Sequence, residues 1–64
     1  MAKFDIDVEL VGQDGNVFSL ISTVLTVMRK NDVSKEDQQQ FQKEVTSGDY
    51  DHALGVMQEW VNVY

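Results

Sequence analysis

The chain opens with a strict alternation of apolar and acidic residues over positions 4–10. Apolar and acidic side chains alternate in the order Phe4, Asp5, Ile6, Asp7, Val8, Glu9 and Leu10. A period of two predicts a half-buried strand whose apolar face is covered by other elements. The carboxylates on the other face are typical of a solvated surface that discourages edge-to-edge pairing; a cation site or a basic partner is the alternative.

After position 16 the apolar residues recur with helical spacing. The pattern predicts a helix over 17–30. Asn16 is the preferred N-cap, with Asp14 as second choice, because both side chains accept hydrogen bonds from the free N–H groups of a first turn. Arg29 and Lys30 suit the negative end of the helix. The apolar stripe consists of Val17, Leu20, Ile21, Val24, Leu25 and Met28.

A second helix is predicted over 35–46. Ser34 begins it with a capping-box-like arrangement in which Asp37 replaces the usual Glu or Gln. Gly48 fits the left-handed backbone position that ends such a helix. Most of this helix is expected to be exposed, because its large apolar residues are only Phe41 and Val45.

A third helix follows Asp49, which is the preferred cap ahead of Asp51. Gly55 weakens this helix by about 1 kcal/mol relative to Ala. We interpret this glycine as a residue that permits a close helix contact. Apolar and polar residues alternate again over residues 61–64. This segment is either a fraying helix end or a short strand beside residues 4–10, and we expect a strand-like or irregular tail. The apolar positions keep helical spacing at Tyr50, Ala53, Leu54, Met57 and Val61, with Trp60 alongside.

These elements predict one small α+β domain over residues 1–64, in the order β-α-α-α with or without a short C-terminal strand. Ordering 64 residues costs about 100 kcal/mol, and so short a chain buries only about 60% of its unfolded surface. Without cysteine no disulfide adds stability. We therefore expect a homo-oligomer.

The helix predicted over 17–30 has an unusual second face. Phe18 and Val27 widen its apolar stripe, and its polar face carries the hydroxyl residues Ser19, Ser22, Thr23 and Thr26 in place of charges. A lightly polar surface is one interpretation. We expect instead that this helix packs on two sides, once in its own core and once against another subunit, where the hydroxyl groups can hydrogen-bond across the interface.

Composition excludes several classes of function. A net charge of −6 disfavours general binding to DNA, RNA or an anionic membrane. The sequence has neither a secretory signal pattern nor an apolar run that could span a membrane, so a cytoplasmic location is expected. One histidine, no cysteine and no EF-hand spacing leave no predicted metal site, and no cofactor is expected.

Catalysis is also not expected. His52 is the only imidazole, and its position in a first helical turn is typical of a cap or a surface histidine. A nucleophile–base pair would require Ser47 or Ser34 to meet it in space, and nothing in the spacing demands this. We expect that the protein is not an enzyme.

Two predicted helix starts, at Asn16 and at Asp49, have glycine beside them. Free N–H groups at such a start can hold an anion, although capping alone is the plainer interpretation. Asp14 and Asp49 oppose an anion, so cations from a neighbouring subunit would be needed. The candidate ligand-binding residues are cap-region residues, cations and aromatic rings: Asp14, Gly15, Asn16, Phe18, Arg29, Lys30, Ser47, Tyr50, His52 and Trp60.

Two blocks, residues 8–18 (VELVGQDGNVF) and 46–54 (TSGDYDHAL), followed by Glu59-Trp60-Val61, carry a family resemblance. The chain resembles a family of short hypothetical proteins of phages and bacteria, and is similar to phage anti-CBASS sponge proteins. The resemblance implies a homo-oligomer that binds cyclic di- or trinucleotides between subunits and sequesters them without chemistry, in the host cytoplasm. The alternatives are an acidic protein–protein interaction module, such as a phage regulator of a host protein, and a self-associating accessory protein.

Overall fold

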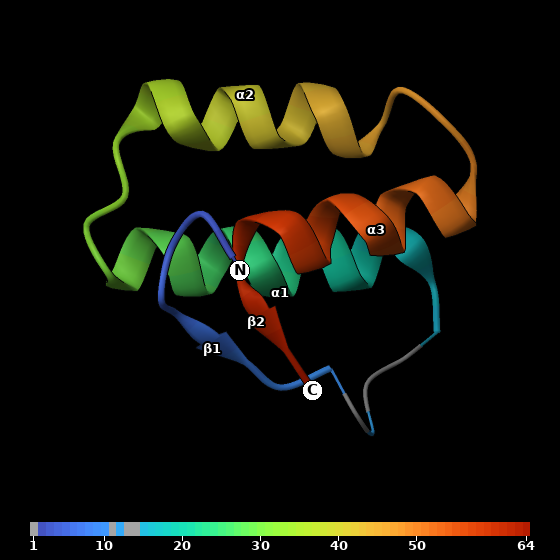
Figure 1. Cartoon of the computed structure of the whole chain (residues 1–64), viewed down its shortest axis with the longest axis horizontal. Helices are drawn as coiled ribbons and strands as arrows, with labels where there is room; N and C mark the ends of the chain where they lie inside the picture. Colours follow the sequence, from blue (N-terminus) through green and yellow to red (C-terminus); the bar gives the residue numbers. More distant parts are fainter. Residues whose placement is uncertain (1, 11, 13–14) are drawn as a thin grey trace.

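The computed structural model describes residues 2–10, 12 and 15–64, which form an α+β fold in the order β-α-α-α-β. Figure 1 shows α1 (Val17–Lys30) and α3 (Tyr50–Trp60) stacked beside each other, with α2 (Lys35–Val45) above them and the two strands below them. The predicted order β-α-α-α is confirmed, and the C-terminal tail, for which a strand-like or an irregular form was expected, contains a short strand. No described helix is long and apolar enough to cross a membrane.

The first and last segments of the chain pair in parallel. The ladder itself is short and joins β1 (Asp7–Val8) to β2 (Asn62–Val63), so the regular strand is much shorter than the alternation over residues 4–10 predicts. Hydrogen bonds continue on both sides of it, from Phe4 N to the Trp60 carbonyl at 2.9 Å and from Leu10 N to the Tyr64 carbonyl at 2.6 Å. The predicted inside–outside pattern holds, because Val8 is buried and the carboxylates are exposed.

All three predicted caps are present. Asn16 Oδ1 accepts a hydrogen bond from Phe18 N, Ser34 Oγ accepts from Asp37 N, and Asp49 Oδ1 accepts from His52 N. Helix α1 has the bounds predicted for it. Helix α2 ends one residue earlier than predicted, at Val45.

Two glycine predictions are wrong. Gly48 does not have a positive φ; a Cβ at this position would instead lie 2.7 Å from Cγ of His52, so glycine is required for the close approach of that ring. Gly55 makes no close helix contact, since a Cβ there would meet nothing within 4 Å. A positive φ outside glycine occurs at Asp32, where the chain turns between α1 and α2.

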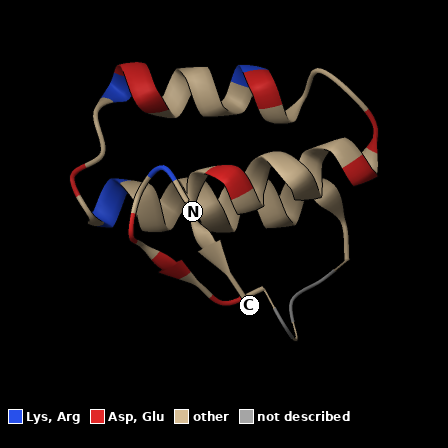
Figure 2. Ribbon diagram, in the orientation of Figure 1, with Lys and Arg blue, Asp and Glu red and all other residues tan. Residues whose placement is uncertain are grey.

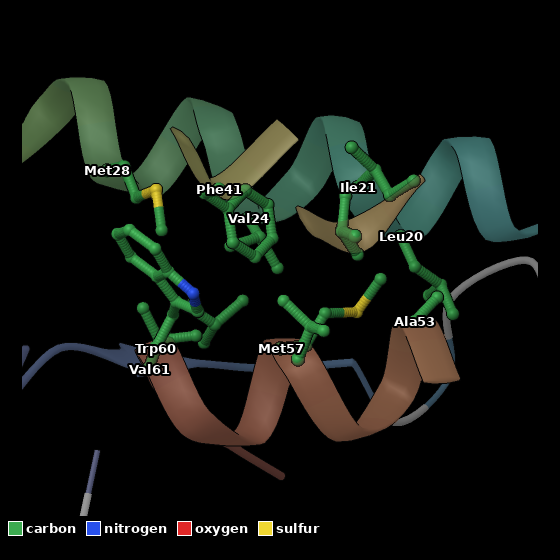
Figure 3. Close-up of a cluster of buried hydrophobic side chains, with 12 residues drawn as sticks. Leu20, Ile21, Val24, Met28, Phe41, Ala53, Met57, Trp60 and Val61 are labelled. Atoms are coloured by element: carbon green, nitrogen blue, oxygen red, sulfur yellow. The ribbon is translucent and has the colours of Figure 1, made fainter. Parts of the chain in front are cut away.

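The core lies between the three helices and is closed by the strands. Figure 3 shows the side chains of α1 and α3 meeting around Phe41 of α2. Trp60 is only 3% exposed, and its ring centroid lies 5.7 Å from that of Phe41 and 5.9 Å from that of Phe4. The fully buried side chains are Val8, Val24, Met28, Phe41, Val45, Met57 and Val61.

Candidate functional site

The two helix starts singled out in the sequence border one pocket. The first turn of α1 contributes Val17 and Phe18, and the start of α3 contributes Asp49 and Tyr50. The pocket has a volume of about 160 Å³ and an apolar floor. It is lined by Val17, Phe18, Ile21, Val45, Thr46, Gly48, Asp49, Tyr50 and Ala53.

Two aromatic side chains at this pocket are accessible to a ligand. Phe18 is 70% exposed and Tyr50 is 44% exposed, so part of each ring faces solvent. Aromatic rings at an apolar pocket offer flat surfaces on which another planar ring stacks. We call this site the Phe18–Tyr50 pocket.

The predicted ligand residues do not all gather here. Gly15 and Asn16 immediately precede the α1 side of the pocket, and Ser47 and His52 flank its α3 side. Arg29 and Lys30 are at the other end of α1, about 16 Å along the helix from Phe18 at 1.5 Å per residue. Asp14 lies outside the described residues.

Trp60 is the clearest misassignment among the candidate ligand residues. Its ring lies in the core, and its indole N–H donates to Glu44 Oε1 at 3.2 Å. The ammonium group of Lys3 lies 4.1 Å from the ring centroid. With 3% of its surface exposed, Trp60 offers no face for a nucleobase to stack on.

Sequence reasoning missed the contribution of helix α2 to the pocket. Val45 and Thr46, at the end of α2, line it together with Ile21 and Ala53. Ile21 and Val45 were expected in the core, where they indeed lie. The side chains of Ile21 and Val45 also line a pocket only because the end of α2 packs against the starts of α1 and α3. The spacing of residues within one helix does not predict that packing.

Ser47 and His52 do meet in space, with 3.1 Å between Oγ and Nε2. Both atoms also reach the carbonyl oxygen of Glu44, at 2.7 Å from Ser47 Oγ and 2.9 Å from His52 Nε2. A carbonyl only accepts, so the hydroxyl donates to it, and the imidazole also donates to it in the tautomer that carries the proton on Nε2. The pair therefore caps the end of α2. A base that receives the serine proton would need the other tautomer, with Nε2 unprotonated.

The charges near the Phe18–Tyr50 pocket do not favour an anion. Among the described residues that line it there is no cation, and the carboxylate of Asp49 caps α3. A second, more polar groove of about 340 Å³ lies between α1 and α2. It is lined by Leu25, Arg29, Lys35, Gln38, Gln39 and Gln42, without a carboxylate among the described lining residues.

The acidic face of the N-terminal segment is tied to the end of the chain. The Asn62 side-chain amide donates to Asp5 Oδ1 at 2.9 Å and to Asp7 Oδ1 at 3.2 Å. No group of three or more potential metal ligands occurs within the described part of the chain. The amide bridge therefore gives these carboxylates a structural partner in the fold.

Comparison of the chain with protein-family models, with curated proteins and with solved structures finds no match in any of the three.

Proposed function

We propose that the protein binds a cyclic di- or trinucleotide and sequesters it without chemistry, as an immune-evasion protein in the cytoplasm of a phage-infected host. The observation that carries this proposal is the Phe18–Tyr50 pocket, which joins an apolar cavity to two accessible aromatic rings. The resemblance of the two sequence blocks to phage sponge proteins supports the same function.

The dimensions of the pocket suit part of such a ligand. Pockets that enclose a whole drug-sized molecule measure roughly 300–1,000 Å³, about two or more times the volume here. One planar base fits the smaller space while the rest of the nucleotide stays at the surface. Stacking of a base on an aromatic side chain contributes about 1–3 kcal/mol and tolerates different bases.

The phosphates need partners outside this pocket. Asp49 is the one charged residue among its described lining residues, and a second negative charge close to it is unfavourable. The cations of the chain lie elsewhere, with Arg29 and Lys35 at the groove between α1 and α2. Binding by an oligomer, in which cations of one copy approach the pocket of another, satisfies both requirements.

Binding without turnover agrees with the arrangement around His52. With its proton on Nε2, the imidazole donates to the Glu44 carbonyl together with the Ser47 hydroxyl, and in that tautomer Nε2 cannot accept the serine proton. A ligand held by stacking and released unchanged requires no such group.

Thermal melts with a panel of cyclic di- and trinucleotides test the proposal. A ligand at 100 times its dissociation constant stabilises the folded state by about 2.7 kcal/mol. For a domain of 60–100 residues this corresponds to a shift in melting temperature of about 10 °C or more. After the melt, denaturation and chromatography should return the nucleotide intact. If no nucleotide in the panel shifts the melt, the proposal fails.

Matched aromatic variants locate the binding. Tyr50→Ala and Phe18→Ala should each abolish the ligand-induced shift, because they remove the two rings of the pocket. Tyr64→Ala is the control, since this ring is 60% exposed and is not among the residues that line the pocket. A shift that survives in the first two variants but disappears in the third would place the ligand elsewhere.

The second candidate is an acidic protein–protein interaction module. Asp5, Asp7 and Glu9 are exposed on one surface, and the Phe18–Tyr50 pocket has room for an apolar side chain of a partner. A host protein captured by the wild type, lost with Tyr50→Ala and retained with Tyr64→Ala would favour this function if the nucleotide panel gives no shift.

A further inference from the structure

The outer face of α1 differs from the rest of the surface. The chain has 11 acidic residues, yet none lies between Val17 and Lys30. The side chains of Leu20, Ile21, Val24 and Met28 are buried, and the opposite side of the helix is exposed. That exposed face consists of Phe18, Ser19, Ser22, Thr26, Arg29 and Lys30, with the half-buried Thr23 at its edge.

The threonine hydroxyls of this face are satisfied within the helix. Thr23 Oγ1 donates to the Ser19 carbonyl at 2.9 Å, and Thr26 Oγ1 donates to the Ser22 carbonyl at 2.8 Å. The sequence led us to expect hydroxyl groups that donate across an interface. The structure shows that both threonine hydroxyls already donate hydrogen bonds within the helix. Another surface can therefore cover this face without leaving either donor unsatisfied.

Charge is distributed unevenly between the ends of α1. Arg29 and Lys30 occupy its last turn, whereas Asp49 and Asp51 lie at the start of α3, beside the first turn of α1. Figure 2 shows the basic last turn of α1 at one end and the acidic start of α3 at the other; the exposed Asp32, in the turn after Lys30, adds a carboxylate near the basic end. Two copies packed with α1 parallel would bring like charges together, and two copies packed antiparallel would pair opposite charges.

We infer that the outer face of α1 binds the same face of a second copy, as an antiparallel two-fold dimer. The uncharged middle of the helix lies at the centre of this interface, with Ser22 opposite Thr26 of the second copy. Phe18 then lies opposite Lys30 of the second copy. Small residues at the centre permit the close approach of about 8 Å between helix axes. A two-fold axis makes both halves of the contact identical.

The same arrangement brings basic residues to the Phe18–Tyr50 pocket. Phe18 and Arg29 lie on the side of α1 that borders α2, because they line the pocket and the groove found there. A two-fold axis perpendicular to α1 keeps this side of both copies on the same side of the dimer. Arg29 of the second copy thus approaches Phe18 of the first, although the dimer itself does not depend on any ligand.

Cysteine pairing tests the register, since the chain has no native cysteine. Ser22→Cys and Thr26→Cys proteins that differ in tag length are mixed under mild oxidation, and the disulfide-linked species are separated by mass. The proposed dimer should yield mainly the mixed 22–26 species. A Cα separation above about 7 Å prevents a disulfide, so residues one turn out of register should pair poorly.

Two results would overturn the inference. A predominance of 22–22 and 26–26 species would indicate parallel packing, and a yield no higher than that of a control pair would indicate no specific interface. Gln58→Cys and Glu59→Cys provide that control, because both positions are exposed on α3. Melts of the reduced proteins verify that each variant folds.

Charge removal provides a second, ligand-free measurement. Sedimentation equilibrium of Arg29→Gln/Lys30→Gln should show at least a tenfold weaker dimer than wild type. Lys35→Gln/Lys43→Gln removes the same charge from α2 and should leave the association within about twofold of the wild type. A folded wild-type monomer at all concentrations would overturn the dimer, and a dimer that binds no nucleotide would overturn only the proposed function.

Discussion

The indole N–H of Trp60 donates a 3.2 Å hydrogen bond to Oε1 of Glu44, which links the end of α3 to α2. The other carboxylate oxygen accepts from Gln40 Nε2 at 2.8 Å. Lys3 lies against the same indole ring, 4.1 Å from its centroid. Glu44 therefore provides a hydrogen-bond acceptor for the indole nitrogen of Trp60. The charge of Glu44 itself stays near the surface.

The stability of the protein should depend on the ionisation of Glu44. Hydrogen bonds from Gln40 and Trp60, with the positive charge of Lys3, lower the pKa of this carboxyl below its ordinary value of 4.5. A lowered pKa in the folded state means that the stabilisation is present above the ordinary value and is lost as the pH falls through the folded value. Urea melts of wild type and Glu44→Gln should therefore differ at pH 7 and converge in acid.

Glu44→Gln is the matched variant, because its amide oxygen still accepts from Trp60 but cannot ionise. Trp60 fluorescence reports unfolding in both proteins. A difference between them that stays constant from neutral pH to strongly acidic pH would show that the charge of Glu44 makes no contribution.

Gly48→Ala should destabilise the protein by about 1–3 kcal/mol, the usual range for overpacking. The added methyl would lie 2.7 Å from Cγ and 2.9 Å from Cβ of His52, too close without displacement of α3. In a His52→Ala background the cost should fall without vanishing, since the Cβ atom remains. Urea melts of the four proteins form the double-mutant cycle; equal costs in both backgrounds would contradict the steric explanation.

Gly55→Ala should have the opposite effect and stabilise the protein by about 0.5–1 kcal/mol, or several degrees in melting temperature. Gly55 lies within α3, it is exposed, and a Cβ there meets no atom within 4 Å. The gain comes from helix propensity alone. A loss of stability in thermal melts would show that another surface packs against this glycine.

Local signals in the sequence were sufficient for the helices. Asn16, Ser34 and Asp49 are side chains that cap a helix within three residues of their own position, so no distant contact is needed to recognise them. The alternation around Val8 likewise identified the buried face of the first segment. Its length as a regular strand was overestimated because the ladder depends on its partner at the other end of the chain.

Only part of the candidate site could be predicted from the sequence. Phe18 and Tyr50 were selected as aromatic residues near two helix starts. The pocket also needs Val45 and Thr46, because the end of α2 packs beside both helix starts and lines it. Trp60 was misplaced because helical spacing alone does not distinguish a core ring from a surface ring. Its burial follows from contacts with Phe4 and Phe41, which are distant in sequence.

Asn62 should be more sensitive to a carboxylate than to truncation. Its amide donates to both Asp5 and Asp7, so Asn62→Ala removes two exposed hydrogen bonds and should cost about 1 kcal/mol. Asn62→Asp also places a third carboxylate beside the other two, and like charges opposite each other in a sheet are destabilising. Urea melts at low salt should therefore rank wild type above Asn62→Ala and Asn62→Asp last.

Salt separates the two effects at Asn62. The screening length falls from about 30 Å at 0.01 M to about 3 Å at 1 M, so added salt should narrow the gap between Asn62→Asp and Asn62→Ala. The gap between Asn62→Ala and wild type should change little, because the lost donor is a neutral amide. Equal stability of the two variants at low salt would mean that the three carboxylates do not repel one another in the fold. A salt-independent gap would instead assign the cost of Asn62→Asp to a steric or hydrogen-bonding defect.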